Sequence, residues 1–442
     1  MATIPQPLLF TWKEIEDLGD LSRLKLLLDN LPDEDLMLAL ESARGNGRDD
    51  YPVRAVWNSL LAGIVFQHPS IESLRRELSR NAQLRQLCGF DPARADKQVP
   101  PSSVYTRFLN SLLNHAEEVD KVFSRLLWQT SAELPDLGQF QAIDGKAVAS
   151  HARRSGRCDD NDRRGDHDAN WGVKSYTVNR TDGSTERQTK RWFGFKVHTI
   201  VDTTYELPLA YEVTPASTAE QPVAIELIKQ LKDNQPLILE TGEYFMADRG
   251  YDDSKLHRQL WDHYQIKPVI GIRNLWQQPE GHDATCAVTG LKGVAYDFEG
   301  NVYCYNTYGH RQKMAHAGFE KDRDTIKYRC PAQHYGLHCS GASQCSIGKS
   351  VRIPIEEDRR VFGPVARDSY KWKDLYKQRT AAERVYSRMD GSFGFENHTI
   401  RGLKKMKLRV GMAYMAMLAM ALGRIKENKA EQMRSLVAQA AG

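Results

Sequence analysis

The sequence lacks a strong excess of either charge, and it lacks long apolar runs. Lys and Arg number 61 against 57 Asp and Glu, so the net charge is only +4, which by itself does not indicate a nucleic-acid-binding protein. No apolar run reaches the roughly 20 residues of a membrane-spanning helix. The N-terminal stretch turns acidic before the apolar core of a signal peptide develops. These absences predict a cytoplasmic protein without a membrane partner.

Cysteine is also scarce. The chain has seven cysteines, an odd number that fits a reducing compartment better than a disulfide framework. None has C-x-x-C spacing, but His334, His338 and four cysteines cluster in one segment: Cys304, Cys330, Cys339 and Cys345. Such residues are ligands of structural zinc, so a zinc ion that holds this segment together, outside the chemistry, is one interpretation. Free buried cysteines or a redox cluster are the alternatives.

The N-terminal part of the chain, to about residue 134, is predicted to be helical. Apolar residues recur at three-and-four spacing from 56 to 65. Ser70 is placed to cap the next helix, and Ser102 or Ser103 a later one. Short helices joined by tight polar turns can form a helix-turn-helix reader of DNA that exposes Arg107. A helical bundle that only packs is the alternative.

From residue 139 the spacing of the apolar residues changes from the period of a helix to that of a strand. Apolar and polar residues alternate or form short buried runs at 140–144, 192–202, 207–213, 244–251 and 266–273, with a helical pattern at 219–233. Antiparallel strands followed by a helix and further strands predict a mixed α/β sheet.

Two aspartates end short buried strands of this sheet. Asp144 closes "FQAID" and Asp248 closes "FMAD", and each is followed by a turn that contains glycine. If the two strands are neighbours, the carboxylates converge, and their repulsion favours a cation between them. Hard oxygen ligands suit Mg²⁺ or Mn²⁺. The alternative is that each aspartate only caps a turn.

A third acid lies in a stretch of strong helix formers. Tyr376, Arg379 and Glu383 have i, i+3 and i+7 spacing, which would place them on one face of a single helix. Three carboxylates can bind two metal ions roughly 3.5–4 Å apart for phosphodiester displacement. Arg379 suits bidentate contact with a backbone phosphate.

Several stretches in a fixed order resemble a family. "RELSRNAQLRQLCGF", "VPPSSVYTRF", "IDGKAV", "ADRGYDD" and Y-x-x-R-x-x-x-E together are similar to bacterial insertion-sequence transposases of the DDE class. The resemblance implies a ribonuclease-H-like mixed sheet with helices, an all-α N-terminal domain and a β-rich, Cys-containing insertion. It implies that Asp144, Asp248 and Glu383 bind metal, with Arg379 and Tyr376 near the DNA phosphates.

The resemblance also implies an activity and partners. The protein would bind transposon ends, cleave DNA with two Mg²⁺ or Mn²⁺ ions and transfer the strands into target DNA, as a homodimer in a synaptic complex at the bacterial nucleoid. A catalytically decayed DNA-binding protein and a nuclease without strand transfer are the alternatives. One departure favours the former: Asp390 stands where the family has Lys. Lys404 or Lys405 could replace that cation.

The expected organisation has four parts. Residues 1–134 would bind DNA ends and mediate oligomerisation, 135–275 and 367–442 would form the catalytic core, and 276–366 the insertion, with a hairpin around Gly300. The C-terminal region carries an excess of basic residues suited to DNA, among them Arg401, Lys404, Lys405 and Lys407. Arg153 and Arg154 lie in a second cluster, a loop that would order on DNA. Residues 410–423 predict a Met-rich core helix.

Overall fold

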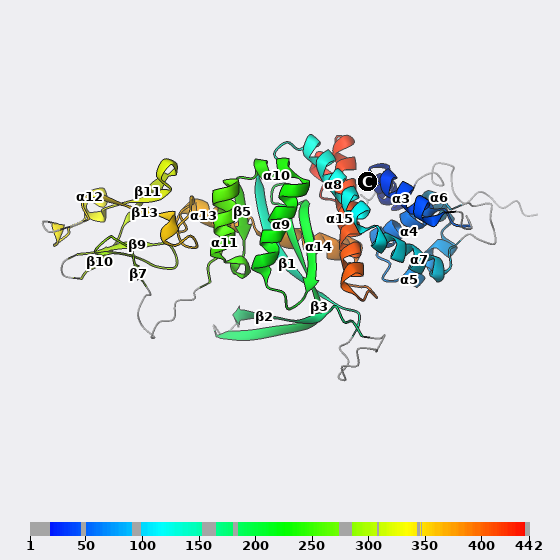
Figure 1. Ribbon diagram of the computed structural model, residues 1–442, viewed down its shortest axis with the longest axis horizontal. Helices are drawn as coiled ribbons and strands as arrows, with labels where there is room; N and C mark the ends of the chain where they lie inside the picture. Colours follow the sequence, from blue (N-terminus) through cyan, green and yellow to red (C-terminus); the bar gives the residue numbers. More distant parts are fainter. Residues whose placement is uncertain are drawn as a thin grey trace, which may run out of the picture.

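The computed structural model describes residues 18–45, 50–90, 99–152, 165–179, 184–273, 285–306, 309–342, 345 and 347–437. Figure 1 shows an elongated molecule with the N-terminal helices at one end, a sheet in the middle and a strand-rich insertion at the other end. The insertion has its own hydrophobic core, whereas the helices and the sheet share another. The fold class predicted from the sequence is therefore confirmed.

The N-terminal region is helical, as predicted. Its helices are α2 (Leu21–Asp29), α3 (Glu34–Arg44), α4 (Val53–Val65), α5 (Ile71–Arg80), α6 (Ala82–Cys88), α7 (Ser102–Asn114) and α8 (Ala116–Glu133). Ser70 caps α5, because its hydroxyl accepts a hydrogen bond from the Ser73 backbone N–H at 3.2 Å. The predicted cap at Ser102 or Ser103 is wrong: α7 begins at Ser102 after Pro101, without a side-chain cap.

The C-terminal helix α15 (Leu403–Lys426) lies against these helices. It packs on α8, α2, α4 and α7 and also on the sheet strand β4 (Pro208–Pro215), so the two ends of the chain share one core. Its 24 residues make it longer than the sequence pattern predicted, and long and apolar enough to cross a membrane. Within the protein, however, 89% of its apolar window is buried, which is the environment of a core helix.

The central sheet combines antiparallel and parallel strands. Its other strands are β1 (Phe140–Ala149), β2 (Asn170–Asn179), β3 (Thr185–Asp202), β5 (Tyr244–Ala247) and β6 (Lys267–Ile270). In spatial order, β4, β3 and β1 are antiparallel, and β1, β5 and β6 are parallel. This is the arrangement of a ribonuclease-H-like core.

Helices cover both faces of the sheet. Figure 1 shows α9 (Glu220–Asn234) in front of it and α14 (Thr380–Phe393) behind it. Shorter helices at the side of β5 and β6 are α10 (Pro236–Thr241), α11 (Ser254–Arg258), a π-helical turn (Gln259–His263) and α13 (Tyr370–Lys377). The acid-bearing strand β1 thus lies in the middle of a layered core.

One long hairpin was not predicted. The sequence indicated a strand only from residue 192 and a loop before it, but β2 and the outer half of β3 pair over ten positions, from Asn170↔Gly194 to Asn179↔Thr185. Trp171 and Val173 remain exposed. Most side chains described in this hairpin are exposed, so its strands lack the apolar alternation by which strands are recognised.

The insertion contains two small antiparallel sheets. One is formed by β7 (Cys286–Ala287), β8 (Val294–Tyr296), β9 (Val302–Tyr305) and β10 (Arg311–Lys313), the other by β11 (Ala315–Glu320), β12 (Thr325–Arg329) and β13 (Ser350–Pro354). The predicted hairpin is present, since β8 and β9 pair across the turn that contains Gly300, with φ +85°. A short helix, α12 (Pro331–Tyr335), follows β12.

Candidate active site

Two of the three predicted acids lie side by side. β1 and β5 are parallel neighbours, and their last paired residues are Ile143 and Ala247. Asp144 and Asp248 are the next residues on each strand, so both carboxyl groups emerge at the same edge of the sheet. The Asp248 carboxylate accepts a hydrogen bond from the Gly250 N–H at 2.7 Å. The two carboxylates are therefore neighbours, as the sequence pattern suggested, but the prediction that Asp144 closes its strand is wrong, because β1 continues to Ala149.

The electrostatics of Asp144 reflect a concentration of negative charge. Its pKa is raised to about 6, chiefly by burial and also by the nearby charges of Asp248 and Glu383, while a hydrogen bond from the Gly145 backbone N–H and the charge of Lys174 oppose the shift. Ionising this carboxyl group in the protein is therefore less favourable than ionising a solvent-exposed aspartate, and a nearby cation would favour its ionised form.

The third acid comes from helix α14. The Tyr386 hydroxyl fastens this helix to the sheet by donating to the Asp144 carbonyl oxygen at 2.7 Å and the Val197 carbonyl oxygen at 3.0 Å. Glu383 lies one turn earlier, and its side chain is 54% exposed and paired with Arg379 at 3.0 Å. Glu383 thus lies at the exposed side of the site, and its negative charge is paired with the positive charge of Arg379.

The single helix predicted for Tyr376, Arg379 and Glu383 is wrong. α13 ends at Lys377 and α14 begins at Thr380, with a turn between them. The two side chains before the acid still lie together, because the Arg379 guanidinium lies 5.4 Å from the centre of the Tyr376 ring. Trp372, which the sequence reading had not singled out, stacks on Tyr376 at 4.8 Å.

The donor atoms suit a hard divalent cation, but they are not gathered around one point. Among the residues described, no group of three His, Cys, Asp or Glu side chains is arranged to hold a metal ion. Asp144 and Asp248 offer carboxylate oxygens of the kind that Mg²⁺ and Mn²⁺ prefer. Glu383 is the outlying member, since its carboxylate pairs with Arg379.

The unusual Asp390 has a partner that the sequence reading did not anticipate. Lys146, two residues after Asp144 on β1, forms ion pairs with Asp390 at 2.6 Å and with Glu396 at 2.7 Å. The expectation that Lys404 or Lys405 replaces the missing cation toward DNA stays a prediction, because this ion pair shows only which cation Asp390 contacts. The lysine beside Asp390 is Lys146, which lies on strand β1 and not on helix α14.

A polar network lies behind the first two acids. The His198 ring contacts the Tyr251 hydroxyl at 3.3 Å and the Thr214 hydroxyl at 3.0 Å, and burial lowers the pKa of His198 to about 4. Glu220, at the start of α9, pairs with Lys196 at 3.3 Å. Sequence reasoning missed these residues, because no local spacing connects them.

Glu220 also explains a glycine of the "ADRGYDD" motif. A Cβ atom at Gly250 would lie 1.9 Å from a Glu220 carboxylate oxygen and 2.8 Å from an Asp248 carboxylate oxygen. No side chain fits there, so the backbone can approach both acids closely.

The residues predicted to contact DNA are distributed over several surfaces. Arg107, Arg401, Lys404 and Lys405 are exposed, whereas Lys407 is paired with Glu212 at 2.9 Å. Arg153 and Arg154 lie outside the described residues.

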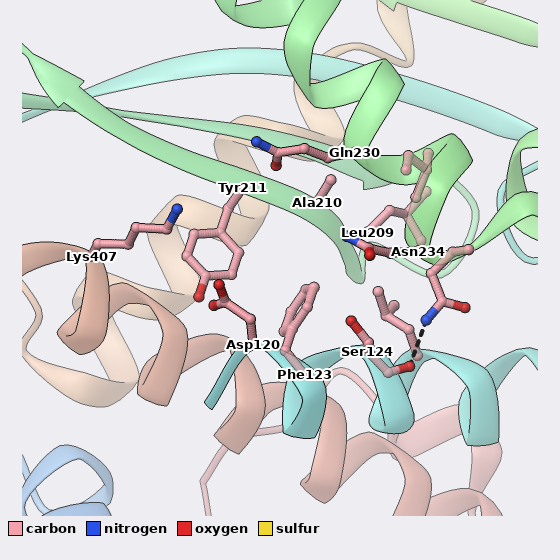
Figure 2. A pocket seen from close by; sticks show the side chains of 12 residues that line it. Asp120, Phe123, Ser124, Leu209, Ala210, Tyr211, Gln230, Asn234 and Lys407 are labelled. Atoms are coloured by element: carbon pink, nitrogen blue, oxygen red, sulfur yellow. Dashed lines mark hydrogen bonds between the residues drawn. The ribbon is translucent and has the colours of Figure 1, made fainter. Parts of the chain in front are cut away.

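Lys407 also lines a pocket at the outer edge of the sheet. Figure 2 shows this pocket of about 270 Å³ between α8, α9, β4 and α15, with Asp120, Tyr211 and Lys407 at one end. Burial raises the pKa of Asp120, whereas the charge of Lys407 lowers it. β3 separates β4 from β1, so this pocket is not part of the acid cluster.

The four clustered cysteines meet in the insertion. Cys304 on β9, Cys330, Cys339 and Cys345 line a pocket of about 150 Å³. All are free thiols. Burial and the proximity of the other three raise the pKa of Cys304 to about 11. As they stand, these thiols are not arranged to hold an ion either, within the part of the chain that the structure describes.

Comparison with known families decides the identity of the chain. The model of a family described as "Transposase DDE domain" matches residues 139–419, which include both strand-end aspartates and the acid of α14. The chain belongs to the DDE transposase family. A second model, "Transposase domain (DUF772)", matches residues 13–111 of the transposase, and this stretch contains the helices α2 to α6.

Other comparisons add little to this assignment. No curated protein matches the transposase. Among solved structures it is similar to a piggyBac transposase synaptic complex with hairpin DNA, at 12% identity, a TM-score of 0.37 and coverage of 96% of this chain and 80% of that chain. A likeness at this score carries no argument. The family match alone makes the protein a DNA-cleaving transposase of a family that uses divalent metal ions.

Proposed function

We propose that Asp144, Asp248 and Glu383 are the catalytic acids of this transposase and bind two divalent ions, Mg²⁺ or Mn²⁺. Bound there, the ions would activate the nucleophile and stabilise the leaving oxygen of a phosphodiester. The observation that carries the proposal is the adjacency of Asp144 and Asp248, each of which follows the last residue paired between the parallel strands β1 and β5. Burial, and to a smaller extent the negative charges of Asp248 and Glu383, raise the pKa of Asp144, and a bound cation would offset this negative charge.

Arg379 and Tyr376 would position the DNA backbone. The guanidinium is held between the Glu383 carboxylate and the Tyr376 ring, at the open side of the acids. A scissile phosphate can compete for this guanidinium through bidentate hydrogen bonds. Glu383 would then be released toward Asp144 and Asp248, so that substrate binding and completion of the metal site are coupled.

The reaction would join DNA as well as cut it. Hydrolysis at the ends of the mobile element frees 3′-hydroxyl groups, and the same acids then serve their in-line attack on target DNA. The helices of residues 1–134 would recognise the ends, with Arg107, Arg401, Lys404 and Lys405 on DNA-facing surfaces, and a homodimer would hold two ends together. In the insertion, residues 276–366, zinc bound by Cys304, Cys330, Cys339 and Cys345 would serve stability only.

Incubation of the purified protein with DNA that carries both element ends and a target plasmid tests the proposal. With Mg²⁺ we expect 3′-hydroxyl ends and joined products, and neither with EDTA. Cleavage without joining would identify a nuclease, and binding without cleavage a decayed DNA-binding protein. Zinc content is measured separately, with the four cysteines replaced by serine as control.

A further inference from the structure

The turn that follows Asp248 orients its carboxylate. Asp248 accepts a hydrogen bond from the Gly250 N–H at 2.7 Å and so caps the short helical turn Arg249–Tyr251. Because a peptide group is planar, the Gly250 N–H moves together with the Arg249 carbonyl group. A side chain that holds this carbonyl group therefore also holds the donor to Asp248.

Arg273 holds that carbonyl group from the neighbouring strand. It follows β6, which pairs with β5, and its guanidinium donates to the Arg249 carbonyl oxygen at 2.8 Å and to the Gly250 carbonyl oxygen at 2.8 Å. Two successive carbonyl groups of the turn are thus bound by one planar side chain, whose donors point in fixed directions. The position of the turn after Asp248 therefore depends on Arg273.

Asp252 joins this turn to the insertion. Its side chain is 1% exposed, and it pairs at 2.8 Å with Arg360, near the end of the insertion. The Asp252 carboxylate also accepts a hydrogen bond from the Arg273 N–H at 2.8 Å, and Arg360 donates to the Arg273 carbonyl oxygen at 3.0 Å. The chain therefore enters and leaves the insertion around one buried carboxylate, beside the turn that orients Asp248.

Arg359, the residue before Arg360, contacts a different part of the core. It pairs with Asp262 on the π-helical turn and with Glu356 in the insertion. Its side chain is 9% exposed and that of Arg360 18%, so both arginines are largely buried. The two residues therefore separate attachment of the insertion to the core from contact with the turn after Asp248.

We infer that Arg273 and Arg360 are positioning residues for DNA cleavage, because they fix the turn that orients the Asp248 carboxylate as a metal ligand. The inference rests on the proposed function, in which Asp248 binds metal. Groups that orient a ligand contribute to metal affinity without touching the metal. The insertion would thus take part in the reaction through Arg360, apart from any role of its cysteines in stability.

Amide hydrogen exchange of the metal-free protein tests whether the two arginines fix the turn. We expect faster exchange across residues 249–253 in Arg273→Met and in Arg360→Met. The matched control is Arg359→Met, which should exchange there at the wild-type rate. Thermal unfolding shows whether each variant keeps the fold. Arg360→Lys, which keeps a charge beside the buried Asp252, should show a smaller increase and replaces Arg360→Met if that variant does not fold.

The metal requirement of cleavage gives a second readout. Loss of a group that orients a metal ligand typically lowers metal affinity about 10- to 100-fold, so Arg273→Met and Arg360→Met should need at least about 10-fold more Mg²⁺ for half-maximal cleavage. Their affinity for DNA should be unchanged, and Arg359→Met should keep the wild-type Mg²⁺ requirement.

Three results would overturn the inference: unchanged exchange across residues 249–253, an unchanged Mg²⁺ requirement in Arg273→Met and Arg360→Met, or an equal rise in Arg359→Met. Failure of the wild-type protein to cleave DNA with Mg²⁺ would instead refute the proposed function. The exchange experiment, which needs neither metal nor DNA, would still show whether the two arginines fix the turn.

Discussion

Two carboxyl groups of the central sheet share a pKa and differ in their surroundings. Burial raises the pKa of both Asp144 and Asp202 to about 6. Asp202, at the end of β3, accepts hydrogen bonds from the Gly138 N–H at 2.8 Å and the Tyr205 N–H at 2.6 Å. Asp144 lies beside two further acids, Asp248 and Glu383.

The difference separates a structural acid from a functional one. Backbone donors around Asp202 satisfy its oxygens and close the turns at the sheet's far end, so nothing further is needed there. The acids around Asp144 add charge of the same sign, which only a ligand can offset. A raised pKa is therefore common to both ends of the sheet, whereas the kind of neighbour distinguishes the end that we propose to be catalytic.

The largest expected effect is on Asp144. Asp144→Asn removes a metal ligand and should lower DNA cleavage by about 10³-fold or more, since several kcal/mol of transition-state stabilisation are lost and each 1.36 kcal/mol is a factor of ten. Its free energy of unfolding without metal should be unchanged or higher, because the repulsion by Asp248 and Glu383 is relieved. Cleavage rates and urea unfolding check this pair of results; a stability loss with intact cleavage would reverse the roles assigned here.

Asp202 should give the opposite result. Asp202→Ala leaves two buried backbone N–H groups without an acceptor and should lower the free energy of unfolding by about 2 kcal/mol. Cleavage per folded molecule should stay at the wild-type rate. Urea unfolding measures the stability, and a cleavage assay corrected for the active fraction measures the rate. A large loss of cleavage at full stability would show that Asp202 is not a purely structural acid.

A buried histidine extends the comparison to a group without partners. Burial lowers the pKa of His257 to about 3, and neither ring nitrogen has a hydrogen-bond partner in the described protein. Below about pH 6.5 the unfolded chain takes up a proton that the folded protein refuses, so stability falls by about 1.4 kcal/mol per pH unit.

His257→Phe should therefore lose less stability between pH 6.5 and 5.5, by about 1 kcal/mol, because the unfolded histidine is already half protonated at pH 6.5. Unfolding by urea at the two pH values gives the difference. The exposed His263 provides the control, since His263→Phe should follow the wild type. Equal pH dependence in wild type and His257→Phe would exclude a neutral buried ring at 257.

The smallest effect is expected at Lys146. The Lys146 side chain is 11% exposed and that of Asp390 33%, so their ion pair should contribute about 1 kcal/mol to stability. A double-mutant cycle with Lys146→Met and Asp390→Leu measures the coupling. Coupling near zero, together with lost cleavage in Lys146→Met alone, would assign this lysine to DNA and not to Asp390.

The predictable parts of the site rest on local patterns. Asp144 and Asp248 are found because each follows a short apolar run, a signal contained within a few residues, although β1 continues past Asp144 to Ala149. The break between Tyr376 and Glu383 carried no such signal, since the residues at the turn are good helix formers. Lys146 pairs with Asp390 across 244 positions, a distance over which sequence spacing gives no information. The hairpin of β2 and β3 was missed because most of its described side chains are polar or exposed.

The most direct test of the central claim compares wild type and Asp248→Asn in strand transfer with Mg²⁺. The substitution keeps the shape of the side chain and removes its charge, and the Asn oxygen can still accept from the Gly250 N–H. Joined products in the wild type and none in a variant that binds the same DNA with equal or higher affinity are predicted. Strand transfer at the wild-type rate by Asp248→Asn would contradict the account.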